Sequence, residues 1–335
     1  MLRSTHRFYI RVWGEGGVSV CRQETAGFPA VFEDMLFTAV CSGLAPNDER
    51  PPEGTLEPVW TEGMVSGFAA SLAGVTKAYP LGILKHEVYE LLLRPGLVQL
   101  EGGETPVYHW SVEAEQAAPP EGRRLPVRLR RRPYPFVDGA LSSLGVPVPQ
   151  GAGSGPLRLY VAVGVLAQLR GETAASLGME RADILCGSLL RDRAGAALVV
   201  TGRFPLAFQT EASAAHVAFS PLTFRAAQQE YLRRGGGESL VGWHHNHPPK
   251  CGRDCLMVVP PCDNDSVFLS VDDNAVFLAG FGSPYMVGLI SGKGKGRRAD
   301  DPVVRAYGWR DGVVREIPFA VFGEQHGTSA TFNFA

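Results

Sequence analysis

The segment Gly242–Pro248 constrains this fold more than any other part of the chain. It reads Gly-Trp-His-His-Asn-His-Pro and follows the apolar residues of a predicted strand. Side chains two residues apart on a strand point to the same face of the sheet. His245 and His247 can therefore bind one metal ion, while Asn246 points away and His244 is expected to pack on the opposite face. A fold that uses both imidazoles must bring a further ligand to the end of this strand.

A serine and an aspartate follow downstream at S-x-x-D spacing. This spacing selects Asp273 rather than its neighbour Asp272. His245, His247 and Asp273 would then supply three ligands to a zinc ion and leave the fourth position for water, which is the arrangement of hydrolytic zinc sites. Ser270 can in addition begin a helix as its N-cap.

The order of these motifs, H-x-H-P and then S-x-x-D, resembles the signature of the JAMM zinc metalloproteases, also called the MPN or JAB family. In that family a glutamate precedes an apolar strand rich in leucine and glycine. Met179–Leu190 resembles this segment, with Glu180 at the position of the glutamate. The resemblance covers about residues 155–320. It implies zinc as the cofactor and an MPN fold, in which helices flank a mixed β-sheet similar to that of cytidine deaminases.

The resemblance also implies a reaction. Glu180 would accept a proton from water and pass it to the leaving amine, and Ser270 would donate a hydrogen bond to the oxyanion. Active family members often cleave the isopeptide bond between a ubiquitin-like C-terminus and a lysine, and others cleave peptides or small conjugates. We therefore expect a zinc-dependent isopeptidase or peptidase that acts on a ubiquitin-like protein conjugate or its C-terminal extension. The alternative is a non-catalytic MPN scaffold or binding module in which zinc is structural.

The chain departs from the family pattern between His247 and Ser270. Twenty-two residues separate the two, more than in the family's usual short loop. Clustered thiolates bind zinc well, and a closed structural site needs four ligands. We interpret the cysteines of this insertion as three ligands of a second, structural zinc ion whose fourth ligand is open, and the alternative is a loop of reduced cysteines. Three of the chain's six cysteines are in it, namely Cys251, Cys255 and Cys262.

Composition limits the number of domains, the kinds of partner and the cellular compartment that we expect for this chain. The chain has 335 residues, enough for two ordinary domains, and its net charge of −2 gives no reason to expect bulk affinity for nucleic acid. No apolar run is long enough to cross a bilayer, and the first residues lack the apolar core of a signal peptide. Six cysteines in a chain of this length do not resemble a secreted disulfide framework. We expect a cytoplasmic protein that does not bind membranes.

Local composition predicts three regions. Residues 1–115 contain helical patterns at Met64–Ala73 and Leu81–Leu93, which predict a small α+β domain that could recognise a protein partner. Residues 116–155 are rich in Pro, Gly and Arg, and we interpret them as a linker whose six clustered arginines are solvated rather than bound to nucleic acid. Residues 156–335 form the JAMM-like domain.

The elements expected in the third region occur in an order that suits the MPN fold. Strands are predicted at Leu157–Val161, Ile184–Leu190, Ala197–Thr201, Ala215–Phe219 and Tyr285–Ile290, and helices at Val165–Leu177 and Phe224–Arg234. We interpret Gly292–Arg298 as a mobile loop and Arg310–Val313 as a hairpin turn.

Overall fold

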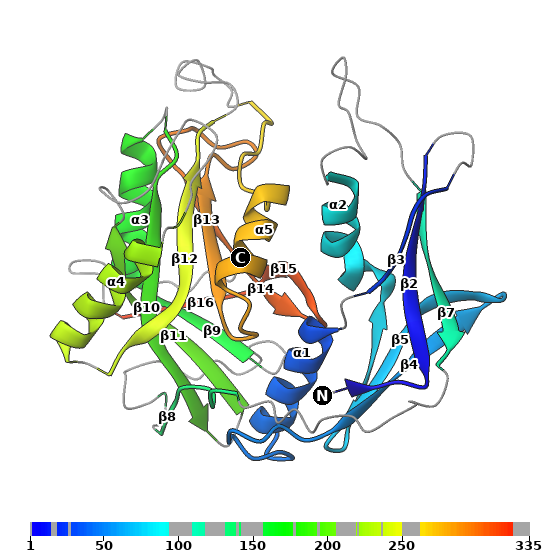
Figure 1. Ribbon diagram of the computed structural model, residues 1–335. Helices are drawn as coiled ribbons and strands as arrows, with labels where there is room; N and C mark the ends of the chain where they lie inside the picture. The colour runs from blue at the N-terminus through cyan, green and yellow to red at the C-terminus, as the bar shows by residue number, and fades with distance from the viewer. Residues whose placement is uncertain are drawn as a thin grey trace. The chain divides into compact units, whose positions relative to one another are not determined.

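The computed structural model (Figure 1) describes residues 2–14, 19–25, 28–93, 109–117, 131–138, 141, 157–176, 179–192, 195–205, 219, 221–235, 237–249 and 262–323. The chain divides into two units, Met1–Tyr134 with Arg310–Val313, and Pro135–Trp309 with Val314–Ala335. Both units contain strands and helices, so the expected α+β class is confirmed. None of the helices within the described residues is long and apolar enough to cross a membrane.

The first unit contains two sheets. One has the strand order β1-β4-β5-β6 and the other the order β3-β2-β7. The bounds are β1 Leu2–Arg3, β2 His6–Trp13, β3 Ser19–Glu24, α1 Pro29–Cys41, β4 Gly54–Thr61, β5 Met64–Leu72, β6 Val75–Pro80, η2 Leu81–Leu84, α2 Lys85–Leu93 and β7 His109–Gln116. The predicted helix that ends at Leu93 is thus present.

An aromatic contact joins the two sheets, and hydrogen bonds join one of them to α1. Phe8 of β2 and Phe68 of β5 meet edge to face, with ring centroids 5.3 Å apart. Asp34 of α1 is buried and accepts hydrogen bonds from Lys77 Nζ at 2.9 Å and Tyr79 OH at 2.6 Å. The charge of Asp34 is therefore paired, as a buried carboxylate requires. This unit consequently has a core of its own.

The helix expected at Met64–Ala73 is wrong, because this segment is strand β5. Two tight turns enclose the strand, one at Glu62 and Gly63 and the other at Ala73 and Gly74, and all four residues have positive φ. Two consecutive residues of positive φ form the type I′ turns that join antiparallel strands. The small residues of β5 allowed a helical interpretation, but pairing with β4 and β6 decides the local structure.

Part of the expected linker makes tertiary contacts. Tyr134 is buried, and its backbone N–H donates to Asn47 Oδ1 at 2.8 Å. The Arg131 guanidinium lies 4.1 Å from the centre of the Tyr134 ring. Phe136–Asp138 forms β8, which pairs with β10. Arg123, Arg124, Arg128 and Arg130 of the arginine cluster lie outside the described residues, so only Arg131 and Arg132 are placed.

The second unit contains a nine-stranded mixed sheet with the order β15-β14-β13-β12-β10-β11-β9-β16, and β8 pairs with β10. The bounds are β9 Leu157–Ala162, α3 Val163–Ala175, β10 Ala182–Asp192, β11 Gly195–Pro205, α4 Pro221–Arg234, β12 Ser239–His247, α5 Val271–Gly280, β13 Val287–Gly292, β14 Val303–Arg310, β15 Val313–Ile317 and β16 Ala320–Phe322. The predicted strands and helices are present, except at Ala215–Phe219, although β13 begins two residues after Tyr285 and α3 ends at Ala175. Residues 215–218 of that segment lie outside the described residues, and Phe219 is not in a strand.

Helices pack on both faces of this sheet. On one face, Trp243 of β12 packs against Phe277 of α5, with ring centroids 5.6 Å apart. On the other face, Thr173 of α3 meets Ser291 of β13, with the hydroxyl oxygens 2.6 Å apart. β12 and β13 are therefore covered on both sides, and β12 is buried from Val241 to His247. The histidine motif ends a central strand rather than an exposed one.

Gly242 allows β12 to approach β13 closely. A Cβ at this position would lie 2.0 Å from the backbone oxygen of Val287. We expect Gly242→Ala to lower the free energy of unfolding by about 1–3 kcal/mol, because the added methyl forces two central strands apart. Urea unfolding of the purified chain measures this change. Gly171→Ala is the matched control. Gly171 lies in α3, and a Cβ added there would meet no atom within 4 Å apart from its chain neighbours and the nearby backbone of the helix. We expect this substitution to raise the free energy of unfolding by about 0.5–1 kcal/mol. Equal effects of the two substitutions would contradict the close approach.

Candidate metal centre

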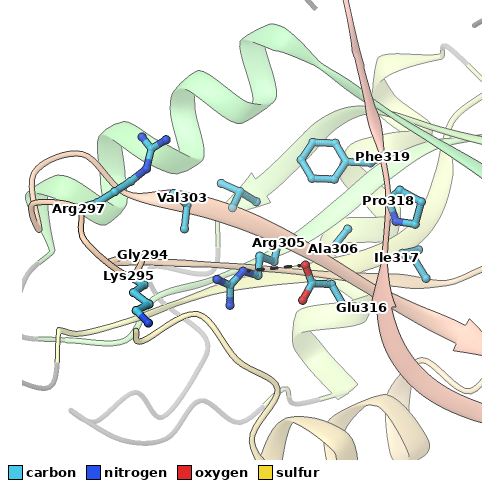
Figure 2. Close-up of a pocket in the computed structure, with 11 residues that line it drawn as sticks. Gly294, Lys295, Arg297, Val303, Arg305, Ala306, Glu316, Ile317, Pro318 and Phe319 are labelled. Atoms are coloured by element: carbon cyan, nitrogen blue, oxygen red, sulfur yellow. Dashed lines mark ion pairs between the residues drawn. The ribbon is translucent and has the colours of Figure 1, made fainter. Parts of the chain in front are cut away.

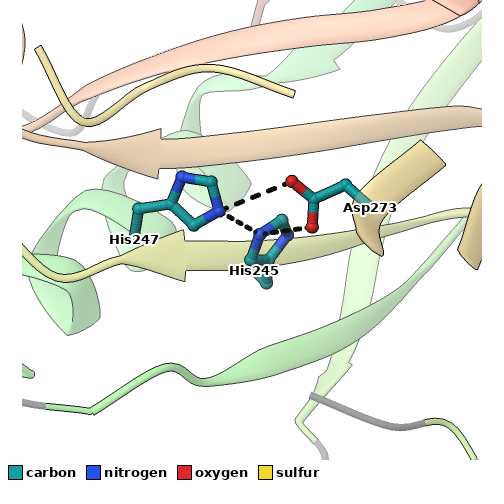
Figure 3. A group of neighbouring side chains, drawn as sticks. All are labelled: His245, His247 and Asp273. Atoms are coloured by element: carbon teal, nitrogen blue, oxygen red, sulfur yellow. Dashed lines mark hydrogen bonds and ion pairs between the residues drawn. The ribbon is translucent and has the colours of Figure 1, made fainter. Parts of the chain in front are cut away.

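Three ligand-type side chains of the second unit converge at the end of β12 (Figure 3). His245 Nε2 lies 2.7 Å from His247 Nε2 and 3.1 Å from Asp273 Oδ1. His247 Nε2 lies 3.5 Å from Asp273 Oδ2. All three residues are buried, with 2%, 8% and 7% of their surface exposed in sequence order. The structure thus brings together the three residues that the two motifs selected as ligands.

Strand alternation and aromatic packing orient the two imidazoles. His245 and His247 lie on the same face of β12 as Trp243, and the His245 ring stacks on the indole at 4.7 Å and 7°. His247 Nδ1 lies 2.8 Å from the backbone oxygen of Ser266, to which it donates when protonated. That bond selects the tautomer whose Nε2 keeps a lone pair for the centre.

A capping box orients the carboxylate. Ser270 is the N-cap of α5, and its Oγ accepts from the backbone N–H of Asp273 at 3.1 Å. Asp273 Oδ2 accepts in turn from the backbone N–H of Ser270 at 2.7 Å. The S-x-x-D spacing is therefore also the spacing of a capping box, so the same four residues start the helix and aim a carboxylate at the imidazoles. Asp272 is exposed and does not join the group.

Burial and mutual contacts shift the pKa values of all three side chains of the centre. Burial alone would raise the pKa of Asp273, but contacts with His245, His247 and Ser270 lower it well below its usual range. Burial lowers the pKa of His245 and outweighs the effect of Asp273. Burial would also lower the pKa of His247, but Asp273, the Ser266 carbonyl and Glu180 together raise it. These shifts favour an ionised Asp273 and a neutral His245, the forms that bind metal, whereas the raised pKa of His247 favours an imidazolium that must lose its proton when a metal binds.

The donor set fits zinc. Two imidazole nitrogens and one carboxylate are ligands that zinc takes readily, and bond lengths of about 2.0–2.2 Å place neighbouring ligand atoms about 3.3 Å apart in a tetrahedron. The two contacts of Asp273 with His245 and His247, at 3.1 and 3.5 Å, bracket that value, and the two Nε2 atoms at 2.7 Å are closer. His245 Nδ1 is buried and has no hydrogen-bond partner among the described residues. The three residues can hold a metal ion after a small outward movement of the rings.

Glu180 lies beside this group. β10 and β12 are antiparallel, with Ala182 opposite His245. One hydrogen bond continues beyond this ladder, because Asn246 N donates to Arg181 O at 3.1 Å. Glu180 comes directly before Arg181, in the segment that leads into β10. Glu180 is half-buried, and its carboxylate is near enough to raise the pKa of His247.

His244 points to the other face, as the alternation predicted. Its Nδ1 lies 2.7 Å from Asp183 Oδ2 and its Nε2 lies 2.7 Å from Ser291 Oγ. Asp183 in turn accepts from Arg203 Nη1 at 2.8 Å. Both ring nitrogens of His244 are therefore engaged in a buried polar network that fixes β12 behind the centre.

Lys293 was not recognised from the sequence as important. The expectation of a mobile loop at Gly292–Arg298 is wrong for this residue, because Lys293 is only 2% exposed. Its ammonium donates to the carbonyls of Cys262, Asn264 and Gly294 at 2.8, 2.7 and 3.2 Å. Lysines among glycines are usually solvated, and the local sequence contains no sign of this burial. Lys293 thus fixes the segment that returns from the cysteine insertion and carries Ser266.

We expect Lys293→Met to lower the free energy of unfolding by about 1–3 kcal/mol, since it removes three hydrogen bonds from a buried ammonium to backbone carbonyls. Urea unfolding measures the loss. Lys295→Met is the control, because Lys295 is exposed and two residues away. A Lys293→Met protein as stable as the Lys295→Met protein would show that the three hydrogen bonds do not stabilise this segment.

The proposed second zinc site is mostly outside the described residues. Cys251 and Cys255 are not placed, while Cys262 is half-buried. Besides Lys293, the backbone N–H of Gly296 donates to the Cys262 carbonyl at 3.3 Å. One end of the insertion is therefore anchored close to the first centre.

A separate pocket of about 540 Å³ lies where β14 and β15 meet the following coil (Figure 2). Arg305 and Glu316 face one another in it at 4.0 Å, and Phe319 and Val303 supply apolar walls. None of Glu180, His245, His247, Ser270 and Asp273 lines this pocket. The candidate metal centre and this pocket are thus distinct features of the unit.

Comparison with known proteins shows no family. No protein-family model matches the chain, and no curated protein matches it. A solution structure of protein DSY2949 from Desulfitobacterium hafniense is 19% identical, with a TM-score of 0.35, over 50% of this chain and 97% of that chain. A solution structure from Salinibacter ruber (strain DSM 13855) is 17% identical, with a TM-score of 0.29, over 48% of this chain and 89% of that chain. Similarity at this level supports no functional argument.

Proposed function

We propose that the second unit is a zinc-dependent amide hydrolase of the JAMM type with an MPN fold. The observation that carries this proposal is the convergence of His245, His247 and Asp273, with Glu180 near His247 in the segment that leads into β10. The H-x-H and S-x-x-D motifs come from a strand end and a helix start that are far apart in sequence. The three ligand-type groups are buried together and have shifted pKa values, and such shifts cluster at functional sites.

Zinc, Glu180 and Ser270 each have a separate role in the proposed reaction. Zinc, when bound, would lower the pKa of water to about 7 and polarise the substrate carbonyl. Glu180 accepts the proton of the attacking water and passes it to the leaving amine, so that the amine departs neutral. Ser270 Oγ accepts a hydrogen bond from Asp273 N and still has its own O–H to donate to the oxyanion.

The proposed substrate is an amide in an extended chain end, and an isopeptide or peptide bond following a ubiquitin-like C-terminus is our first candidate. This choice rests on the resemblance of the motifs to JAMM proteins. A protein partner could be recruited by the first unit. A non-catalytic MPN scaffold, in which the metal only stabilises the fold, is the alternative, and the half-buried glutamate beside His247 favours the enzyme.

The test uses the full chain loaded with zinc and two substrates: a ubiquitin-like protein joined through its C-terminus to a lysine reporter, and a short peptide amide. We expect release of the amine, loss of activity with a chelator of zinc, and recovery when zinc is returned. Zinc bound without cleavage of either substrate would support the scaffold. Cleavage that a chelator leaves unchanged would contradict a metal-dependent mechanism.

A further inference from the structure

Asn246 lies between the two imidazole ligands in sequence but points to the opposite face of β12. Its side chain is buried, with 2% of the residue exposed. The side-chain Nδ2 donates to Met179 O at 3.1 Å, and Oδ1 accepts from the backbone N–H of Arg181 at 2.6 Å. The backbone N–H of Asn246 donates to Arg181 O at 3.1 Å. One residue therefore makes three hydrogen bonds to the two neighbours of Glu180.

These bonds replace a regular strand ladder. β10 begins at Ala182, so Met179–Arg181 lies before the assigned strand. In a regular antiparallel pair, the N–H of Arg181 would donate to a backbone carbonyl of β12. Here the side-chain amide of Asn246 accepts that N–H and also donates to the carbonyl on the other side of Glu180. The backbone of Glu180 is thereby held on both sides.

We propose that Asn246 is a positioning residue that holds Glu180 beside the metal centre, an inference that rests on the proposed function. The residue between the two imidazole ligands then ties the base to the strand that carries those ligands. Any movement of β12 would carry Glu180 with it.

The choice of an amide side chain supports this role. A buried position that only fills space is usually occupied by an apolar residue, whereas a buried amide must be hydrogen-bonded. Both functional groups of the Asn246 amide are satisfied by the peptide groups that flank Glu180. Misplacing a catalytic group by about 1 Å can lower a rate by about 100-fold. Loss of the hydrogen bonds that position Glu180 should therefore lower the rate of hydrolysis measurably.

The test begins with Asn246→Ala in the full chain. We expect kcat to fall by about 10- to 100-fold with little change in KM, because Glu180 is displaced while the ligands stay on β12. Zinc affinity, measured by competition with a chromophoric chelator, should stay near the wild-type value. In the metal-free folded protein, the Arg181 amide should exchange its hydrogen about tenfold faster, since it has lost its acceptor.

Asn246→Asp is the second variant. It has the same shape and keeps the acceptor for the Arg181 N–H, but it cannot donate to Met179 O. We expect the Arg181 amide to stay protected and kcat to fall less than in Asn246→Ala. A double-mutant cycle then separates positioning from a general structural effect. In a Glu180→Gln background, Asn246→Ala should lower the residual hydrolysis no further.

Two results would overturn the inference: unchanged exchange of the Arg181 amide in Asn246→Ala, or an equal further loss of hydrolysis in the Glu180→Gln background. If the wild-type chain hydrolyses neither substrate, the proposed function fails. The exchange of the Arg181 amide still decides in that case whether Asn246 holds the Glu180 segment.

Discussion

Asp273→Ala is expected to weaken zinc binding by more than the roughly 10- to 100-fold that loss of an outer hydrogen-bonding partner of a zinc ligand costs. Asp273 is the only carboxylate in the described group of three, and its ionised form is stabilised there by both imidazoles and the Ser270 N–H. Its removal leaves two neutral nitrogens to hold a dication. Chelator competition at neutral pH, combined with metal analysis of the purified chain, measures this loss.

Asp272→Ala is the matched control, since it removes an exposed carboxylate one residue away. We expect its zinc affinity to equal that of the wild type. Because Asp273→Ala also removes half of the capping box, its unfolding must be measured, and we expect a loss of about 1 kcal/mol. Equal zinc affinities of the two variants in folded protein would rule out Asp273 as a ligand.

Metal analysis of Cys255→Ala would in parallel count any second ion held by the cysteine insertion.

Glu180→Gln is expected to lower kcat by about 10²- to 10⁴-fold, the usual contribution of a general base, with zinc still bound. The amide has nearly the shape of the carboxylate, so the side chain at this position fills the same space. The amide cannot accept a proton, however, so no side chain at this position can transfer the proton from water to the leaving amine. Rates on the peptide amide and metal analysis of the same sample measure the two quantities together.

Glu230→Gln is the control for removing a glutamate from the same unit. Glu230 makes ion pairs with Arg233 and Arg234 on the surface of α4, and surface pairs contribute little. We expect wild-type rates for this variant. A Glu180→Gln protein that keeps wild-type kcat would remove Glu180 from the mechanism, and one that loses its zinc would instead make Glu180 a ligand.

The two ligand motifs could be predicted from the sequence because each depends on local geometry. Alternation along a strand places His245 and His247 on one face wherever that strand lies, and the spacing from Ser270 to Asp273 is that of a capping box. The same local rules correctly oriented His244 away from the ligands. They failed at Met64–Leu72, where two hairpin turns and pairing with neighbouring strands outweighed a helical pattern.

Residues whose role depends on a distant partner could not be recognised in this way. Lys293 follows a strand in a glycine-rich stretch, and its burial depends on carbonyls more than twenty residues earlier in the chain. Asn246 was expected only to point away from the ligands, and its partners at Met179 and Arg181 are supplied by another segment of the chain. Neither residue's role belongs to a motif, and long-range contacts alone reveal what it does.

By itself, the sequence determined which side chains have the chemistry of a metal centre and in which local direction each points, because the periods of a strand and a helix start are short-range properties. Only the tertiary structure decided that β12, the start of α5 and the approach to β10 meet at one buried place. That meeting depends on strand order and on packing between segments far apart in the chain, and it sets the distances and protonation states on which the proposed zinc chemistry depends.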